Sequence, residues 1–198
     1  MKTIDNFNFA GKKALIRVDF NVPLDENFKV TDNTRIEAAK PTIEKILKDG
    51  GTAVLMSHLG RPKGERNDKY SLRHIVSEVE KVLGKKVIFV DDCVGEVAEK
   101  AVAAAPAGSV VLLENLRYHN EEEKGDENFS KQLAKLGDIY VNDAFGTAHR
   151  AHASTTIVAK FFPNNKCFGY LLAKEIESID KVMRSGEKPV TAILGGSK

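Results

Sequence analysis

Ala14–Asp19 reads ALIRVD, and this short, mostly apolar run sets the pattern for the rest of the chain. Further runs of this kind are Thr52–Met56 (TAVLM), Val87–Val90 (VIFV), Val110–Leu113 (VVLL), Ile139–Val141 (IYV) and Val190–Leu194 (VTAIL). Their apolar residues are continuous rather than alternating, which is typical of parallel strands that are buried on both faces. We therefore expect each run to be a parallel strand.

Segments with helical periodicity separate these runs. Pro41–Asp49 has Pro41 in a position suited to a first helical turn and stops at Gly50. The other segments are Ser71–Leu83, Val94–Ala104, Asp126–Leu136 and Tyr170–Arg184. Strands that alternate with helices predict an α/β fold, here a Rossmann-like three-layer arrangement with a parallel sheet and helices on both faces.

The composition excludes several classes of protein. Hydrophobic residues make up 42% and charged residues 29%, which is ordinary for a soluble globular protein. There is no run of about 18 apolar residues and no apolar signal core near Met1, so we expect no membrane partner. A net charge of +2 with 7% aromatic residues does not favour nucleic acid binding. Cys93 and Cys167 are predicted to be reduced thiols of a cytoplasmic protein.

Polar residues gather in the segments that follow the expected strands. In open parallel sheets, ligands bind beyond the carboxyl ends of the strands. The segments are Asp19–Pro23, Ser57–Pro62, Glu114–His119 and Asn142–His152. They contain three of the eight arginines and four of the five histidines. Arg35 follows the first of them, and we expect it to reach the same edge of the sheet.

These loops predict a site for an anion. Each guanidinium can donate two hydrogen bonds to the oxygens of a phosphate or carboxylate. Histidines would add donors whose charge could follow that of the ligand. A single loop arginine or histidine is usually just solvated, and the hypothesis depends on several of them lying together. A small, multiply charged acid or any phosphate ester would fit.

Other polar features have simpler interpretations. Glu121–Glu123 is predicted to be a solvated acidic surface or the start of a helix, and His74 a surface or core-edge residue. Gly195–Lys198 follows an expected strand but lacks the spacing of a P-loop.

Several motifs resemble the phosphoglycerate kinase family in identity and order, and the resemblance covers the whole chain. They are Arg17–Pro23 (RVDFNVP), Asn33–Ile36 (NTRI), Ser57–Pro62 (SHLGRP), Glu114–Arg117 (ENLR), Asn142–Phe145 (NDAF), Ala148–His152 (AHRAH) and Leu194–Lys198 (LGGSK). The last has Ser where the family has Ala.

The resemblance implies a transferase of glycolysis and gluconeogenesis. This kinase moves a phosphoryl group between ATP and 3-phosphoglycerate, giving 1,3-bisphosphoglycerate and ADP, with Mg²⁺ bound to the nucleotide. The family is typically a cytoplasmic monomer of two α/β domains. By resemblance, residues 1–170 are the phosphoglycerate-binding domain, 171–186 an interdomain helix, and 187–198 the first strand of a nucleotide-binding domain.

The resemblance also assigns roles to particular residues. Asp19 and Asn21 match positions that hold the hydroxyl and carboxylate end of the substrate. Arg35 matches a catalytic arginine that meets the carboxylate. The positions that match the cradle for the substrate phosphate are His58, Arg61, Arg117 and Arg150. Residues between these in the same motifs, also expected at the substrate site, are Phe20, Leu59 and Gly60. Lys198 matches a catalytic lysine that reaches the nucleotide phosphates, and no metal ligand is expected in this chain.

The chemistry explains why no catalytic triad is expected. The attacking carboxylate is already deprotonated, so the reaction needs positioning and cations rather than a general base. We expect the 198-residue chain alone to bind phosphoglycerate without turning it over, because the adenosine pocket and metal-holding carboxylate would lie in the second half of the enzyme. The alternative is a stand-alone module that binds phosphate esters and has no catalytic activity.

Overall fold

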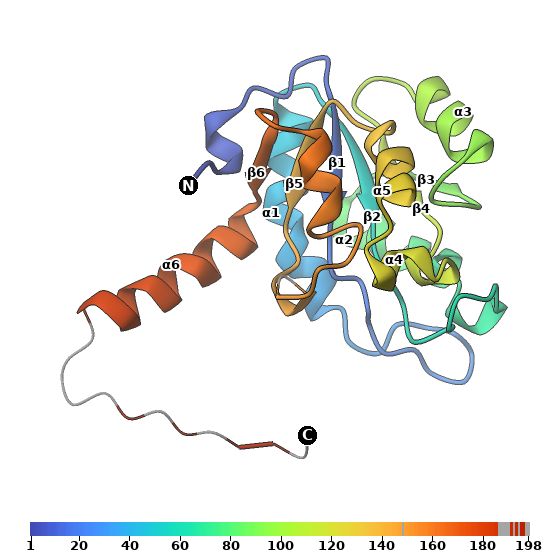
Figure 1. The fold of residues 1–198 in the computed structure, drawn as a ribbon. Helices are drawn as coiled ribbons and strands as arrows, with labels where there is room; N and C mark the ends of the chain where they lie inside the picture. The colour runs from blue at the N-terminus through green and yellow to red at the C-terminus, as the bar shows by residue number, and fades with distance from the viewer. Residues whose placement is uncertain (148, 186–190, 192, 194, 197–198) are drawn as a thin grey trace.

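The computed structural model describes residues 1–147, 149–185, 191, 193 and 195–196. Its described strands form one parallel sheet in the order β3-β4-β2-β1-β5-β6 (Figure 1). The strands are β1 (Lys13–Arg17), β2 (Thr52–Met56), β3 (Val87–Val90), β4 (Val110–Leu113), β5 (Ile139–Asn142) and β6 (Lys166–Phe168). The parallel α/β fold predicted from the sequence is therefore confirmed.

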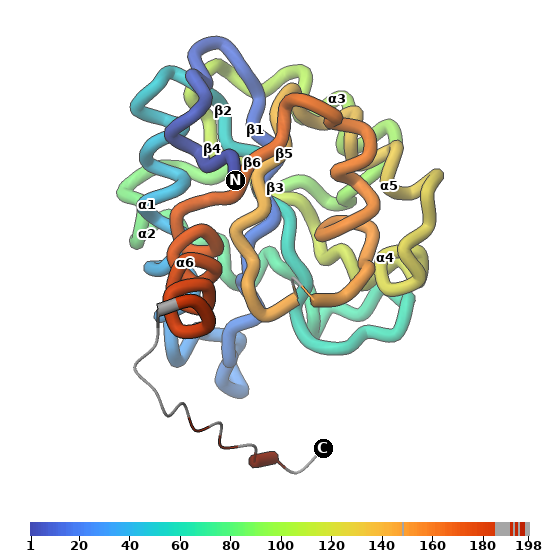
Figure 2. The backbone as a smooth tube through the Cα atoms, turned by 60° about the vertical axis from the view of Figure 1, so that its left-hand side comes forward, coloured from blue at the N-terminus to red at the C-terminus, as the bar shows by residue number. Residues whose placement is uncertain are grey.

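Helices cover both faces of this sheet. The helices are α1 (Thr34–Lys48), α2 (Val76–Leu83), α3 (Glu96–Ala104), α4 (Glu121–Lys124), α5 (Glu127–Ala134) and α6 (Tyr170–Ser185). Short 3-10 helices occupy Ile4–Asn6, Asp68–Tyr70, Leu72–Ile75, Leu116–Tyr118, Phe145–Thr147 and Ile157–Phe161. Helix α6 projects away from the sheet in Figure 1, and in the turned view of Figure 2 it is seen nearly along its axis. No helix in the described part of the chain is long and apolar enough to span a bilayer.

Alternating strand residues supply two separate hydrophobic cores. In β1, Ala14 and Ile16 join the core under α1 and α2, whereas Leu15 joins the core under α3 and α5. Successive side chains of a strand point to opposite faces, so a continuous apolar run serves both cores at once. This double burial fixes the sheet, and its carboxyl edge holds the loops that carry the polar motifs.

The observed strands match most of the expected ones closely. β6 was not predicted, because it has only three residues and lies at the sheet edge with an exposed Lys166. The expected run Val190–Leu194 and the expected segment 187–198 include residues outside those described.

Helix α1 begins earlier than predicted. It starts at Thr34, so Pro41 lies inside the helix and not in its first turn. Proline lacks the N–H that would bond back to the preceding turn. Pro41 and Glu37 are both exposed, so water can reach the carbonyl that proline leaves without its helical donor. The helix therefore continues through the proline, and Arg35 lies in its first turn.

The acidic run Glu121–Glu123 was only partly predicted. It does begin a helix, α4, but Glu122 is fully buried and not solvated. Its carboxylate accepts hydrogen bonds from the backbone N–H and the hydroxyl of Ser154, at 2.8 and 2.5 Å. A buried carboxylate needs such partners, and they come from a segment that is distant in the sequence.

Candidate functional site

The loops at the carboxyl ends of β1, β2, β4 and β5 surround a cleft of about 270 Å³. Its lining residues are Asp19, Asn21, Arg35, His58, Gly60, Arg61, Arg117, Gly146, Thr147 and Arg150. All the substrate-binding residues expected from the resemblance are among them except Phe20 and Leu59. The cleft lies at the carboxyl end of β1, which has β2 on one side and β5 on the other. The strand order changes direction at this point, and ligands usually bind there in such sheets.

Phe20 and Leu59 anchor the loops and do not line the cleft. Both side chains are buried in the hydrophobic core. The N–H of Phe20 donates to the Ser57 hydroxyl at 2.9 Å, and the N–H of Leu59 donates to the Asn115 side-chain oxygen at 3.2 Å. Each apolar residue thus fixes the polar residues beside it in the sequence.

Asp19 and Arg35 form an ion pair at the cleft. Arg35 Nη1 donates to Asp19 Oδ1 at 3.2 Å and to the Asn21 carbonyl at 2.9 Å. The Arg35 side chain is 52% exposed, so this pair is worth little as a stabilising contact. Both bonds use Nη1. The other two nitrogens of the Arg35 guanidinium make no hydrogen bond to a described residue.

Asn21 and Gly60 join the loops after β1 and β2. Asn21 Oδ1 accepts a hydrogen bond from the N–H of Gly60 at 2.9 Å. Gly60 has φ +60°, and a Cβ there would lie 2.3 Å from the Tyr70 ring. A glycine is required because the backbone both adopts the left-handed region and passes close to an aromatic ring.

His58 lies in the cleft as a neutral imidazole. Its Nδ1 lies 2.9 Å from Arg17 Nη2. A guanidinium can only donate, so Nδ1 accepts and Nε2 carries the proton. Burial above all, followed by the charges of Arg17 and Arg117, lowers the pKa of His58 to about 2. In the ligand-free cleft His58 is therefore an uncharged donor.

Three arginines complete the cationic side of the cleft. Arg117 is the most enclosed, with 9% of its side chain exposed, and burial lowers its pKa. Glu123 lies 3.9 Å away and partly offsets its charge. Arg61 and Arg150 are exposed. The charges of Arg61 and Arg150 lower the pKa of Arg117 further, so these cations repel one another across the cleft.

Three buried polar atoms at or near this cleft lack a hydrogen-bond partner within the described ranges. They are Arg117 Nε, Thr147 Oγ1 and His152 Nδ1. Burial lowers the pKa of His152 and so favours its neutral form. Unpaired buried polar atoms are uncommon, and their occurrence beside a cationic cleft is consistent with a ligand that supplies oxygens. The motif Asn142–His152 contained Thr147 and His152, but nothing in the motif singled them out.

Two buried residues after β4 hold the loop that carries Arg117. Glu114 accepts from the Ser71 hydroxyl at 2.6 Å and from the Leu72 N–H at 2.8 Å. Asn115 donates to the Leu59 carbonyl at 2.7 Å and accepts from the Arg117 N–H at 3.0 Å. These contacts tie the loops after β2 and β4 together. The sequence placed both residues in the motif Glu114–Arg117 but indicated no role for them, because Ser71, Leu72 and Leu59 are distant in the chain.

The cleft itself does not offer a metal site. Asp19, its one lining carboxylate, is paired with Arg35. Within the described residues, the one group that could supply three metal ligands is Asp92, Cys93 and His119, which do not line the cleft. In that group His119 Nε2 is hydrogen-bonded to Asp92 Oδ1 at 2.8 Å. Lys198, which was expected at the nucleotide phosphates, lies outside the described residues.

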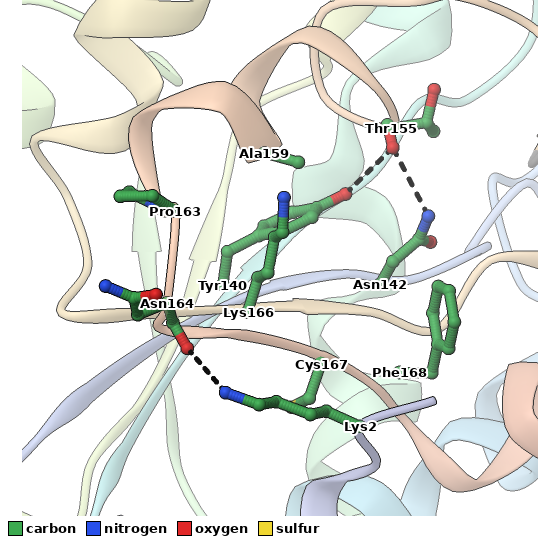
Figure 3. A pocket seen from close by; sticks show the side chains of 10 residues that line it. All are labelled: Lys2, Tyr140, Asn142, Thr155, Ala159, Pro163, Asn164, Lys166, Cys167 and Phe168. Carbon is green, nitrogen blue, oxygen red and sulfur yellow. Dashed lines mark hydrogen bonds between the residues drawn. The ribbon is translucent and has the colours of Figure 1, made fainter.

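A larger cavity of about 400 Å³ lies apart from this cleft (Figure 3). It is mainly apolar, and Lys2 and Lys166 contribute its cations. Its Tyr140 hydroxyl already donates to the Ser154 carbonyl at 2.7 Å. None of the residues expected at the substrate site lines this cavity. We therefore take the clustering of charge, rather than cavity volume, as the guide to the candidate site.

Comparison with protein families gives one match over almost the whole chain. A family model described as phosphoglycerate kinase matches residues 4–198. Among curated proteins, the phosphoglycerate kinase of Porphyromonas gingivalis is 50% identical over 220 residues, covering 99% of this chain and 52% of that protein. The phosphoglycerate kinase of Moorella thermoacetica is 53% identical over 196 residues, covering 99% of this chain and 49% of that protein.

Solved structures show the same likeness. The phosphoglycerate kinase of Coxiella burnetii matches with a TM-score of 0.86 and 36% identity, over 99% of this chain and 48% of that one. The enzyme of Pyrococcus horikoshii matches with a TM-score of 0.87 and 32% identity, over 100% and 49%. This chain thus spans about half the length of the relatives that it matches.

Proposed function

Because this chain belongs to the phosphoglycerate kinase family, we propose that it carries the 3-phosphoglycerate site of an enzyme that transfers a phosphoryl group between ATP and the carboxylate of that acid. In this proposal residues 1–170 form the substrate domain and α6 the interdomain helix. The nucleotide and its Mg²⁺ are held mainly by residues outside this chain, with Lys198 reaching the nucleotide phosphates. The 198 residues alone bind substrate without turnover.

The observation that carries this proposal is the convergence of positive charge in the cleft. Four arginines line it, against the single carboxylate of Asp19. Clustered guanidinium groups repel one another, so the arrangement is favourable only with an anion between them. 3-Phosphoglycerate has a phosphate at one end and a carboxylate at the other. It can therefore meet the arginines on both sides of the cleft.

The phosphate end would be held by groups that do not change with pH. His58 donates from Nε2 as a neutral imidazole. Arg61, Arg117 and Arg150 each donate from a guanidinium, and such forked hydrogen bonds suit phosphate oxygens. Fixed donors favour the phosphate dianion, which is the main form at neutral pH.

The other end of the substrate would meet Asp19, Asn21 and Arg35. Asp19 accepts a hydrogen bond from the substrate hydroxyl, and Asn21 is already oriented by its bond to Gly60. As the carboxylate oxygen bonds to the γ-phosphorus of ATP, the bond from that phosphorus to the bridging oxygen breaks and ADP leaves. The carboxylate has no proton to lose, so no base is required. Arg35 retains donors for the carboxylate and for the phosphoryl group in transfer, where charge crowds most. Its stabilisation should therefore be greatest in the transition state.

Calorimetric titration of the chain with 3-phosphoglycerate, D-glycerate and inorganic phosphate tests the proposal. We expect 3-phosphoglycerate to bind most tightly, because only it offers both charged ends. If inorganic phosphate binds as tightly as 3-phosphoglycerate, the alternative of a general anion-binding module is favoured. If none of the three anions binds, both the 3-phosphoglycerate site and the general anion-binding module are contradicted.

A further inference from the structure

We propose that Glu122 and Ser154 are positioning residues that act through Arg17 to hold His58 in the cleft as an Nε2–H donor. The inference deepens the proposed function and rests on it, because the donor serves catalysis only if the cleft takes a phosphate. None of these three residues lines the cleft. Their role is to determine which proton His58 carries.

An unbroken chain of hydrogen bonds joins the four residues. Glu122 Oε2 accepts from the Ser154 hydroxyl at 2.5 Å, and that hydroxyl accepts from Arg17 Nε at 2.8 Å. Arg17 Nη2 then donates to His58 Nδ1 at 2.9 Å. The exposed fractions of Glu122, Ser154 and Arg17 are all 0%, and that of His58 is 5%. No exposed link allows water to replace a step.

The four residues of this hydrogen-bonded chain come from four different segments of the fold. Arg17 ends β1, His58 follows β2, Glu122 belongs to α4, and Ser154 lies in the segment before the 3-10 helix Ile157–Phe161. The backbone N–H of Ser154 also donates to Glu122 Oε1, at 2.8 Å. The carboxylate is therefore bound by both donors of one serine, which fixes the hydroxyl as acceptor for Arg17.

Glu122 is the charge that allows Arg17 to be buried. Burial disfavours the charged guanidinium and lowers its pKa, and Glu122 is the largest influence that opposes this. Asp19 and Tyr140 act in the same direction more weakly, whereas Arg117 acts against it. A buried cation without a counter-charge is strongly destabilised. The serine hydroxyl lies between the two charges and transmits the attraction as two hydrogen bonds.

The orientation of Arg17 determines the tautomer of His58. Three of its nitrogens are engaged, because Nη1 donates to the Val18 carbonyl, Nε to Ser154 and Nη2 to His58. A planar guanidinium held at three points cannot rotate away, and it offers no acceptor for an Nδ1 proton. The ring proton is therefore confined to Nε2. Burial above all, and then the charges of Arg17, Arg117, His152 and Arg35, also disfavour a second proton on His58.

Nitrogen NMR on the ¹⁵N-histidine-labelled chain tests the proposal directly. We expect His58 to be a neutral Nε2–H tautomer from pH 5 to 8. A folded wild-type chain with a protonated or Nδ1–H His58 would overturn the proposal without any variant. This measurement needs no ligand, so it can support the assigned His58 tautomer even if the chain fails to bind 3-phosphoglycerate and the proposed function is wrong.

Ser154→Ala removes the bridging hydroxyl and leaves the charges of Glu122 and Arg17 in place. The matched control is Ser130→Ala, which deletes an equally buried hydroxyl that donates to the Asp126 carbonyl at 2.7 Å. In Ser154→Ala we expect mixed His58 tautomers and roughly tenfold weaker binding of inorganic phosphate, the effect of one poorly placed hydrogen bond to a charged ligand. Wild-type tautomer and affinity in a folded Ser154→Ala chain would refute the positioning role.

Glu122→Gln provides a second test, in case the serine variant fails to fold. It removes the charge while keeping the shape of the side chain, and Glu121→Gln makes the same change at an exposed position of α4. We expect the His58 spectrum to change only in Glu122→Gln. An equal response of both glutamine variants would show that the general charge of α4, not the chain of contacts, controls His58.

Discussion

Replacing Arg117 by alanine should weaken substrate binding without weakening the fold. Arg117 lines the cleft with only 9% of its side chain exposed. Burial above all, and then the charges of Arg150 and Arg61, lower its pKa, and its Nε makes no hydrogen bond to a described residue. The ligand-free protein thus gains little from this guanidinium. Its contribution should appear when an anion is bound.

The size of the effect follows from the contacts that the ligand would make. A hydrogen bond to a charged group is worth about 1.5–3 kcal/mol, and about 1.4 kcal/mol corresponds to a tenfold change in affinity. Arg117→Ala also relieves repulsion from the neighbouring arginines, which places the result in the lower part of that range. We expect affinity for 3-phosphoglycerate to fall roughly 10- to 50-fold.

Isothermal titration calorimetry and thermal unfolding of the same samples measure both sides of this prediction. Arg73→Ala is the matched control, because Arg73 is paired with Asp68 and does not line the cleft. Arg117→Lys should recover part of the affinity, since it keeps the charge and loses the fork. Affinity within twofold of wild type in a folded Arg117→Ala chain would refute the assignment of Arg117 to the phosphate.

Four further outcomes are expected. Arg35→Ala in the full-length enzyme should lower kcat far more than it raises the substrate Kd, because its contact strengthens as charge moves; equal effects in steady-state kinetics and titration would contradict this. Burial raises the pKa of Asp143 to about 6. Its folded form thus holds a proton that the unfolded form loses near pH 4, and its effect on stability becomes less favourable as pH rises from about 4 to 6. Asp143→Asn should remove that pH dependence and raise the free energy of unfolding by on the order of 3 kcal/mol relative to wild type at pH 7.5. Urea unfolding that gives the same difference between variant and wild type at pH 4.5 and at pH 7.5 would contradict this prediction. Gly60→Ala should cost more stability than Gly84→Ala, since both have positive φ but only the former would meet a neighbour, Tyr70, at 2.3 Å; equal melting temperatures would argue against that clash. Affinity for 3-phosphoglycerate should fall steeply between about 0.05 and 0.5 M salt through screening, and titrations that show no salt dependence would contradict the cationic cleft.

The sheet could be predicted from the sequence because each buried strand carries its own signal. Thr52–Met56 and Val110–Leu113 are buried throughout and consist almost entirely of apolar residues, and both were predicted with the observed bounds. The start of α1 was predicted wrongly because proline is common in the first turn of a helix, and Pro41 was placed there. The structure shows that Pro41 is tolerated inside the helix because it lies on the exposed face. Local pattern therefore describes elements that are buried on both faces better than elements whose limits depend on solvent.

The cleft residues could be grouped from the sequence, but their chemical states could not. The position of His58 after β2 was expected, whereas its neutral form depends on its burial and on Arg17, which lies 41 residues earlier on the neighbouring strand. Glu122 was interpreted as solvated because it stands in a run of three glutamates. Its partner Ser154 is 32 residues away, and a serine in a loop has no sequence signal for such a role.

The place of β5 beside β1 has a consequence for how this protein emerges from the ribosome. Ala14 pairs with Ile139, so these partners are 125 residues apart in the chain. At a synthesis rate of about 5–20 residues per second, β5 is made roughly 6 to 25 seconds after β1. During that time β1 and β2 can pair, but one edge of β1 stays open to other chains. A nascent chain would therefore keep a central strand edge exposed to aggregation until β5 has been made and has paired with β1.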